Sequence, residues 1–385
     1  MTALAARTRD TVTFHAVELL KEASALQRAG IDIISLGVGE PDFTAAPLVV
    51  EAMERASRAG RSGYSAPAGL PELREAIAGF YANHLGVTVD PARVIVTSGA
   101  SGALMLAAMA LVNPGDEVLM PDPCYPPNRN FIGAAGGITK LIPTTPENRY
   151  QLSSLDIEQH WGPSTRGVLI ASPSNPTGTS IARDELDRLI RTVHARQGFV
   201  MMDEIYLSLS YDGPRQSALA LDDNVIILNS FSKYFNMTGW RLGWMIVPQH
   251  MVAPIEKMAA SYVICAPTLS QHGAVACFED ESLALFEQRR LAFQQRRDFL
   301  VPALESIGIK VPVKPDGAFY VYGDISAHSR DSNIFSSSLL HGARVAAVAG
   351  LDFGPAHASN TMRFAYTTGL ERLEEAVHRM KAYLS

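Results

Sequence analysis

The chain has 385 residues, of which 47% are hydrophobic and 19% charged, with a net charge of -6. This length exceeds the usual size of one core, so we expect two domains of an ordinary soluble globular protein. No basic run could follow a phosphate backbone, no apolar run nears the roughly 20 residues that span a bilayer, and residues 1–10 lack the apolar core of a signal peptide. We therefore expect neither nucleic acid nor a membrane as a partner.

A regular pattern of strands and helices begins near residue 92. Short runs of Val, Ile and Leu alternate with helical stretches, which indicates a parallel sheet covered on both faces. The predicted fold class of this part is therefore α/β. The strands are predicted at 93–97, 117–120, 167–170, 198–202 and 224–228, with an amphipathic helix at 183–197.

The pattern changes after about residue 280. Residues 283–307 predict a long charged helix that is kinked or restarts at Pro302, and residues 318–322 predict a strand of a smaller α+β unit. The N-terminal segment is expected to pack with this unit. The predicted domains are a large α/β domain at 46–285 and a small α+β domain at 1–45 and 286–385.

The three cysteines, Cys124, Cys265 and Cys277, form no close pair of the Cys-x-x-Cys kind. Neither a disulfide framework nor a zinc site is predicted, and we expect no bound metal. Three reduced thiols fit a cytoplasmic location.

Polar clusters follow three of the predicted strands. An open parallel sheet presents the C-terminal ends of its strands to one ligand crevice, so we expect these clusters to meet there. Each cluster alone is a common turn or helix cap, whereas their order and spacing indicate a single site. The clusters are Asn175-Pro176-Thr177-Gly178, Asp203-Glu204-Ile205-Tyr206 and Ser230-Phe231-Ser232-Lys233.

Together these clusters resemble the class I/II aminotransferases of pyridoxal 5'-phosphate (PLP) fold type I. The similarity covers nearly the whole chain and is closest to the aspartate, aromatic and alanine aminotransferase group. It implies a mostly parallel seven-stranded central sheet covered by helices, with a smaller α+β domain. Further matching motifs are Gly37-Val38-Gly39-Glu40-Pro41-Asp42, residues 64–74, Gly239-Trp240-Arg241 and Met362-Arg363-Phe364.

The resemblance implies that Lys233 holds PLP as a Schiff base, the internal aldimine. Once substrate frees its amine, Lys233 would move a proton between the amino-acid Cα and C4' of the cofactor. Asp203 would pair with the pyridine nitrogen, while Tyr206 and Asn175 would bind the cofactor's O3'. The catalytic residues implied are therefore Lys233, Asp203 and Tyr206.

Other matched residues are implied to surround the cofactor's phosphate and ring. Small residues at the start of a helix would offer free N–H groups to the phosphate, and Arg241 would add a bidentate fork. Tyr125 would stack on the pyridine ring, where many members carry Trp. Tyr64 would reach the phosphate of the neighbouring subunit, which implies a homodimer with shared active sites. The phosphate contacts implied are Ala100, Ser101, Ser230, Ser232, Arg241 and Tyr64.

Arg363 matches the family residue that clamps the substrate α-carboxylate through two hydrogen bonds. The resemblance adds Asn175 and the backbone of Gly39 to this substrate site. It implies that the enzyme moves the amino group of an L-α-amino acid to a 2-oxo acid by a ping-pong mechanism through the Lys233 aldimine.

The side chain of the amino acid is less well defined by the sequence. The helix that begins at Ser101 offers no cation for a second carboxylate, so we expect an apolar, aromatic or small side chain. Phe14, His15 and Val38 are candidates to line its pocket, although plain packing explains each of them equally well.

Other functions match parts of the sequence. Ser230-x-x-Lys233 satisfies a motif of penicillin-recognising hydrolases, but their Ser-Asp-Asn and Lys-Thr-Gly motifs are missing, as is the Gly-x-Gly-x-x-Gly of NAD sites. A non-enzymatic PLP-binding regulator would need a DNA-binding module, which the N-terminal residues do not resemble. A PLP-dependent C-S β-lyase on the same scaffold stays open as the alternative, because the site residues themselves do not distinguish elimination from transamination. The Gly239-Trp240-Arg241 run and the match at residues 64–69 favour a transaminase.

Overall fold

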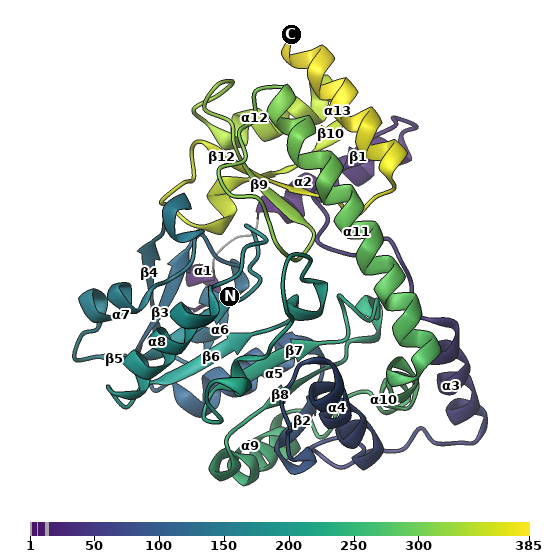
Figure 1. Ribbon diagram of the computed structural model, residues 1–385, viewed down its shortest axis with the longest axis vertical. Coiled ribbons are helices and arrows are strands. Elements are labelled where there is room, and N and C mark those ends of the chain that lie inside the picture. The colour runs from purple at the N-terminus through teal and green to yellow at the C-terminus, as the bar shows by residue number, and fades with distance from the viewer. Residues whose placement is uncertain (1, 6, 12–14) are drawn as a thin grey trace.

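The computed structural model describes residues 2–5, 7–11 and 15–385. A seven-stranded sheet crosses the lower half of the molecule as drawn, and a group of shorter strands lies above it (Figure 1). The strands of the large sheet are β2 (Val94–Thr97), β3 (Glu117–Asp122), β4 (Ile138–Pro143), β5 (Thr165–Ala171), β6 (Phe199–Asp203), β7 (Ile226–Ser230) and β8 (Gly243–Ile246).

The strand order of this sheet is β2-β8-β7-β6-β5-β3-β4. All pairings are parallel except those of β8 with β2 and β7, so the sheet is mostly parallel, as the sequence predicts. Successive strand residues enter different cores: Val168 and Ile170 join one buried cluster and Leu169 joins the other. Both faces of the sheet are therefore buried, which explains the unbroken apolar runs.

Helices cover the two faces separately. Side chains of α5, α6 and α9 pack on one face, and those of α4, α7, α8 and α10 pack on the other (Figure 1). Among the residues that the structure describes, no helix is long and apolar enough to cross a membrane. The helices are α4 (Pro71–His84), α5 (Gly99–Leu111), α6 (Pro127–Ala134), α7 (Ser154–His160), α8 (Arg183–His194), α9 (Gln249–Tyr262) and α10 (Thr268–Val275).

Helix α8 shows how the sequence pattern produces this packing. Leu186, Leu189, Ile190 and Val193 recur at the helical spacing and are all buried against the sheet. Each such side chain contributes about 1.5–3 kcal/mol through burial. The opposite face of the helix is charged and faces water. The helix therefore covers the sheet with its apolar face while it connects β5 to β6.

The smaller unit is built from both ends of the chain. Its three-stranded antiparallel sheet has the order β11-β12-β9, and a two-stranded parallel sheet joins β1 to β10. The strands are β1 (Ile34–Ser35), β9 (Tyr320–Asp324), β10 (Val345–Ala346), β11 (Val348–Ala349) and β12 (Thr361–Ala365). The remaining helices outside the large sheet are α1 (Arg7–Asp10), α2 (His15–Arg28), α3 (Pro47–Arg58), α12 (Ser332–Ser338) and α13 (Leu370–Leu384).

Helix α11 (Asp280–Ser306) links the two units and contacts α3 near one end and α13 and β9 near the other (Figure 1). It continues through Pro302, so of the two predicted alternatives the restart is wrong, and the kink stays a prediction. The proline removes one helical N–H, which leaves the carbonyl of Asp298 without its usual donor. A domain boundary at residue 285 falls inside this helix, and that division stays a prediction.

Two strands of the large sheet were missing from the sequence prediction. β4 lies at the sheet edge and mixes apolar residues with the half-exposed Lys140, so its pattern is weak. β8 is short and begins just beyond the Gly239-Trp240-Arg241 motif, which is typical of a loop. β8 is short and β4 has a mixed pattern, so only pairing with a neighbouring strand identifies each of them as a strand.

Candidate active site

A cavity of about 270 Å³ lies at the C-terminal ends of β5, β6 and β7. The register pairs Ala171 with Asp203 and Asp203 with Leu228, so these parallel strands end at one edge of the sheet. Every site residue expected from the sequence, except Tyr64, lines this cavity. Its lining residues are Ala16, Leu20, Gly37, Gly39, Ala100, Ser101, Leu104, Tyr125, Ala171, Asn175, Asp203, Ile205, Tyr206, Ser230, Ser232, Lys233, Arg241, Tyr320 and Arg363.

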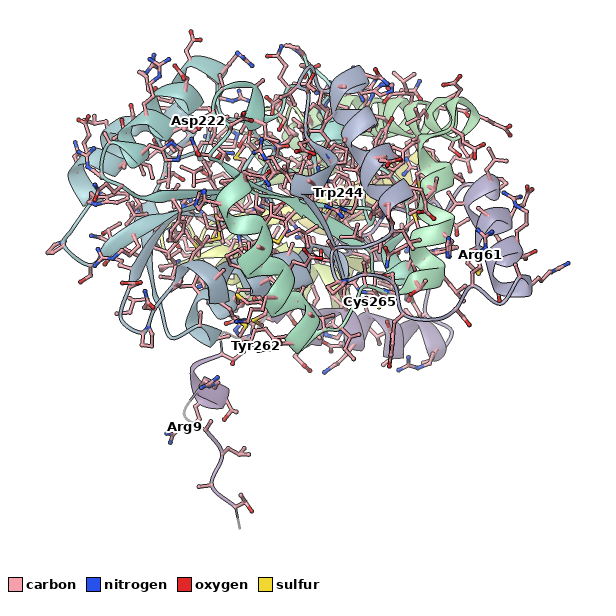
Figure 2. The ribbon with its side chains drawn as sticks, turned by 90° about the horizontal axis from the view of Figure 1, so that it is seen from below. Arg9, Arg61, Asp222, Trp244, Tyr262 and Cys265 are labelled. Atoms are coloured by element: carbon pink, nitrogen blue, oxygen red, sulfur yellow. The ribbon has the colours of Figure 1, made fainter. Side chains whose placement is uncertain are left out.

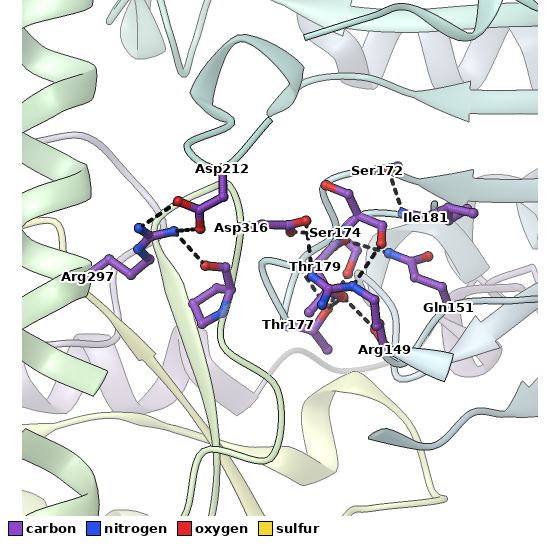
Figure 3. Close-up of polar contacts among 12 residues, drawn as sticks. Arg149, Gln151, Ser172, Ser174, Thr177, Thr179, Ile181, Asp212, Arg297 and Asp316 are labelled. Carbon is purple, nitrogen blue, oxygen red and sulfur yellow. Dashed lines mark hydrogen bonds and ion pairs between the residues drawn. The ribbon is translucent and has the colours of Figure 1, made fainter. Parts of the chain in front are cut away.

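The loop after β5, which carries Asn175, is held by a chain of buried hydroxyl groups (Figure 3). The hydroxyl oxygens of Ser174 and Thr177 are 2.5 Å apart, and those of Thr177 and Thr179 are 2.7 Å apart. The hydroxyl of Thr179 then donates to the carbonyl of Arg149 over 2.6 Å. Because each of these hydroxyls has a partner, the network fixes the loop without leaving any of the three hydroxyl groups unpaired.

The same loop is tied to the segment that leads into β9. Asp316 accepts a hydrogen bond from the backbone N–H of Ser180 at 2.9 Å and forms an ion pair with Arg149 at 3.0 Å (Figure 3). The backbone N–H groups of Asp316 and Gly317 both donate to the carbonyl of Gly178. The loop of Asn175 and the start of β9 are therefore fixed to each other.

Asp203 ends β6 and is 6% exposed. Its Oδ1 accepts a hydrogen bond from the backbone N–H of Ile205 at 3.0 Å. Burial raises the pKa of Asp203 to about 6, although that N–H and the nearby Lys233 act in the opposite direction. Such a carboxylate is stabilised in its charged form by a cation placed in the cavity.

Tyr206 comes shortly after Asp203 in the chain, and its side chain is buried. Its hydroxyl oxygen is 2.8 Å from the hydroxyl oxygen of Tyr320, which comes from the smaller unit. Burial raises the pKa of both phenols, so both keep their protons at neutral pH.

Lys233 and Arg241 lie on the loop of residues 231–242, which joins β7 to the antiparallel strand β8. Ser230 pairs with Gly243, so the two ends of the loop are bonded to each other. One closed loop therefore presents both cationic side chains to the cavity.

The amine of Lys233 is enclosed by backbone and aromatic groups. Its Nζ donates a hydrogen bond to the carbonyl of Gly39 at 2.7 Å and lies 5.8 Å from the ring centre of Phe319. Burial lowers the pKa of Lys233 to about 8, while the charge of Glu40 acts to raise it. This amine loses its proton far more readily than an exposed lysine, which makes it a nucleophile near neutral pH.

The first turn of α5 forms another wall of the cavity through Ala100 and Ser101. The first N–H groups of a helix have no helical acceptor, and together with the helix dipole they attract an anion. Gly99 has a φ of 73°, and a Cβ there would lie 2.9 Å from Nη2 of Arg241. Arg241 donates to the carbonyl of Thr238, and no carboxylate of the described residues pairs with it.

Arg363 lies on β12 and is 2% exposed. Its Nη1 donates to Oδ1 of Asn175 at 2.9 Å, and its Nη2 donates to the carbonyl of Gly37 at 2.8 Å. Its guanidinium carbon is 4.4 Å from the ring centre of Tyr320 and 5.0 Å from that of Phe353. The buried Nε has no hydrogen-bond partner, so an incoming carboxylate would satisfy it.

Comparison with known proteins decides the family. Residues 31–380 match the family model described as aminotransferase class I and II. The chain belongs to the class I and II aminotransferases. The valine–pyruvate aminotransferase of Mycobacterium tuberculosis (strain ATCC 25618 / H37Rv) is 37% identical over 373 residues, which is 96% of each chain.

Solved structures agree over the whole chain. A crystal structure of an aminotransferase from Mycobacterium tuberculosis has a TM-score of 0.96 and 36% identity, and covers 100% of this chain and 99% of that one. Aspartate aminotransferase from Thermus thermophilus with maleate has a TM-score of 0.94 and 32% identity over 100% of both chains. The family and the fold predicted from the sequence are therefore confirmed.

Class I and II aminotransferases are PLP-dependent enzymes that act on amino acids and 2-oxo acids, so this transaminase requires PLP. The cavity fits the cofactor on three counts. Asp203 is a buried carboxylate that a pyridinium would pair with, and the first turn of α5 with Arg241 offers a phosphate site. Lys233 supplies a partly buried amine in the same cavity. The named relatives are transaminases, and the β-lyase alternative is not favoured.

Tyr64 is the expected site residue that lies outside the cavity. Its side chain is 82% exposed, in the segment that precedes α4. The contact expected from the sequence is with the phosphate of a neighbouring subunit. That contact stays a prediction.

Several lining residues were not assigned to the site from the sequence. Ala16 and Leu20 lie on one face of α2 at the i, i+4 spacing, a signal that could have identified them. His15 and Val38 are not among the lining residues. The backbone N–H of His15 donates to Asp352, and its side chain is exposed. Phe14 lies outside the described residues.

No cluster of His, Cys, Asp or Glu within the described part of the chain could hold a metal ion. The three cysteines are free, and two of them, Cys124 and Cys277, are buried.

Proposed function

We propose that this aminotransferase moves the amino group of an L-α-amino acid to a 2-oxo acid by a ping-pong mechanism, with Lys233 holding PLP and Arg363 binding the substrate carboxylate. One observation carries the proposal. A single cavity contains a partly buried lysine with a lowered pKa and a buried arginine without a carboxylate partner among the described residues. A ping-pong reaction needs only one carboxylate site, since the amino acid and the 2-oxo acid occupy it in turn.

Each residue at this edge of the sheet has a separate role in transferring or holding a proton. When bound, PLP supplies the electron sink for the charge that develops at the substrate Cα. Lys233 Nζ accepts the proton that leaves Cα, because its lowered pKa keeps a useful fraction of the amine neutral. Asp203 holds the proton on the pyridine nitrogen. Tyr206 and Nδ2 of Asn175 donate to O3', since Oδ1 of Asn175 is already bonded to Arg363.

The other cofactor contacts hold the phosphate and the ring in place. The N–H groups at Ala100 and Ser101 bind the phosphate at the start of α5, and Arg241 adds a charged fork. The hydroxyls of Ser230 and Ser232 face the same cavity. Tyr125 is half-buried on the cavity wall, which suits a ring that stacks on the pyridine.

We propose that the donor amino acid has an uncharged, mainly apolar side chain. The charged residues that line the cavity are Asp203, Lys233, Arg241 and Arg363, and each is assigned to the cofactor or to the α-carboxylate. No cation of the described lining remains for a second carboxylate. Leu20 lies beside Gly37, whose carbonyl holds Arg363, so apolar surface borders the substrate end. The valine–pyruvate aminotransferase relative carries a name that agrees with such a donor.

The test is a half-reaction screen on the purified holoenzyme. Single amino acids are added without a 2-oxo acid, and the visible absorbance of the bound cofactor is followed. Valine, leucine and phenylalanine should change it rapidly, whereas aspartate and lysine should react at least ~100-fold more slowly, because an unpaired buried charge costs several kcal/mol. An equal response to aspartate would disprove the side-chain assignment alone.

Two other outcomes of the screen bear on the reaction itself. If no amino acid changes the absorbance, the transamination proposal fails. If cystathionine yields pyruvate and ammonia without any 2-oxo acid, the enzyme is an eliminase. The matching control is Lys233→Ala, in which no amino acid should be converted to its 2-oxo acid, because the base that accepts the Cα proton is missing.

We also propose a homodimer in which Tyr64 of the partner subunit completes each phosphate site. Tyr64, Tyr262 and Ile264 are large exposed side chains, at 82%, 61% and 49% exposed. Figure 2 shows the chain before the helix that carries Arg9 pointing away from the rest of the molecule, whereas that helix itself contacts α6. We expect residues 2–5 to pack on the second subunit.

Mixed dimers test the shared site. A dimer of Tyr64→Ala and Lys233→Ala subunits contains one cavity with both residues intact and one with neither. At limiting PLP the mixture should be more active than either variant alone. Activity that equals the average of the two variants would contradict the sharing of Tyr64.

We propose a cytoplasmic location for the enzyme. Support comes from the three free cysteines, which suit a reducing compartment. Cell fractionation with an antibody against the protein checks this, and recovery in a secreted fraction would contradict it.

A further inference from the structure

Tyr320 contacts the groups assigned above to chemistry, and it has no assigned role. Its hydroxyl oxygen lies 2.8 Å from that of Tyr206, and its ring centre lies 4.4 Å from the guanidinium carbon of Arg363. Its hydroxyl oxygen would lie 2.5 Å from a Cβ on Gly39, whose carbonyl accepts the hydrogen bond of Lys233. One side chain therefore touches the cofactor end and the carboxylate end of the cavity.

The sheet register explains why Tyr320 faces Arg363. β9 and β12 are antiparallel, and Arg363 is directly opposite Tyr322. Opposite residues point to the same face, as do residues two apart on a strand, so Tyr320 is the diagonal neighbour of Arg363 on that face. The guanidinium therefore stacks on the ring, an attraction that is strongest when both groups are buried.

The hydroxyls of Tyr206 and Tyr320 carry two protons, and the hydrogen bond between them uses only one. Burial raises the pKa of Tyr206 and of Tyr320, so both hydroxyls are protonated at neutral pH. One proton forms the bond between them, and the other can be donated elsewhere. If Tyr320 donates to Tyr206, the proton of Tyr206 is free to point into the cavity.

We propose that Tyr320 is a positioning residue with two functions, and this inference rests on the proposed function of the site. Its hydroxyl donates to Tyr206 and so aims the proton of Tyr206 at O3' of PLP. Its ring holds the Arg363 guanidinium in the plane that receives the substrate carboxylate. The two ends of the cavity are thus aligned by one side chain that is anchored to β9.

The hydroxyl function is tested with Tyr320→Phe. The visible absorbance of the holoenzyme is titrated against pH without any substrate. The midpoint should shift by about half to one pH unit, as expected for one lost hydrogen bond, in the same direction as in Tyr206→Phe but by less. Tyr322→Phe is the matched control, because its hydroxyl bonds to Thr361 at 2.6 Å, on the same face but away from Tyr206. Its midpoint should equal that of the wild type.

The ring function is tested through the KM for the amino acid. Tyr320→Leu removes the aromatic face and should raise KM by about 10- to 30-fold, the loss expected for a desolvated stack on a guanidinium. Tyr320→Phe keeps the face, so its KM should stay within about threefold of the wild type. Equal KM values for the two variants would overturn the ring function.

The double variant Tyr206→Phe/Tyr320→Phe completes the test of the hydroxyl function. If Tyr320 acts only through Tyr206, the double variant titrates like Tyr206→Phe alone. Because both hydroxyls are removed, neither is left unpaired, so this comparison is available even if Tyr320→Phe does not fold.

The remaining outcomes separate this inference from the proposed function. A further shift in the double variant, or a Tyr320→Phe midpoint equal to that of Tyr322→Phe, overturns the role of Tyr320 while amino acids still react with the wild type. A wild type whose absorbance ignores every amino acid overturns the proposed function instead.

Discussion

The two ends of the cavity are built in different ways. At the cofactor end, Asn175, Asp203 and Lys233 follow three parallel strands that finish at one edge of the large sheet. At the carboxylate end, Arg363 lies within a strand and is held by aromatic rings and by the carbonyl of Gly37, which is 326 residues away in the chain. The first end depends on where strands stop, and the second depends on long-range packing.

This difference indicates how each end should respond to substitution. Groups at the sheet edge are assigned to bond making and proton transfer, so their loss should remove the reaction. Groups around Arg363 are assigned to binding and alignment, so their loss should weaken the substrate complex while the cofactor stays bound. The following predictions test that division.

The largest effect is expected for Lys233→Ala. Loss of the amine removes both the covalent anchor and the base, and turnover should fall by about 10⁴-fold or more. Borohydride reduction followed by mass spectrometry should find cofactor covalently bound to the wild type but not to the variant. A variant that still retained covalently bound cofactor would show that a different residue is the anchor.

Arg363→Ala should raise the KM for the amino acid by about 100-fold, since truncating one partner of a buried charge pair costs several kcal/mol. The PLP content, measured by absorbance after gel filtration, should stay that of the wild type. Loss of PLP from this variant would place Arg363 at the cofactor end and break the division between the two ends.

The rate at which the apoenzyme captures PLP should depend on pH, because burial lowers the pKa of Lys233. Its pKa is lowered to about 8, so the neutral amine dominates above pH 8 and becomes rarer below it. The rate at which apoenzyme captures PLP should rise about tenfold per pH unit up to that point and then level off. Glu40→Gln should lower the midpoint, because the charge of Glu40 acts to raise this pKa. A rate that keeps rising to pH 10 would show an ordinary lysine.

The smallest effect concerns the contact between the two ends. In Gly39→Ala the new methyl would collide with the Tyr320 hydroxyl, which should cost about 1–3 kcal/mol of stability and raise the KM for the amino acid. The control is Gly79→Ala within α4, where a Cβ meets nothing within 4 Å and should stabilise the protein by about 0.5–1 kcal/mol. Equal midpoints of thermal unfolding for Gly39→Ala and Gly79→Ala would mean that the cavity wall accommodates the added methyl group without a loss of stability.

The sequence predicts the cofactor end better than the carboxylate end for a physical reason. A strand, the polar cluster after it and the parallel arrangement of strands are local signals, so the amino-acid pattern alone assigns Asp203 and Lys233 to one edge of the sheet. Arg363 was assigned only through a family resemblance. Nothing local in Met362-Arg363-Phe364 shows that its side chain would meet Asn175.

Tyr320 illustrates what local patterns leave out. It was recognised only as part of a predicted strand at 318–322, whereas its importance comes from Tyr206 and Gly39, which are distant in sequence. The register of β9 on β12 decides that it faces Arg363, and register is set by pairing rather than by either strand alone. The edge strand β4 was missed for the same reason.

The closed loop of residues 231–242 has a consequence for evolution and design. Lys233 and Arg241 stand at fixed positions on a segment whose ends are bonded through Ser230 and Gly243. In the proposed site, in which Lys233 and Arg241 bind two ends of one cofactor, the loop sets the distance between the amine and the guanidinium. A single residue inserted into or deleted from this loop would change that distance, even though every catalytic side chain remained in the chain.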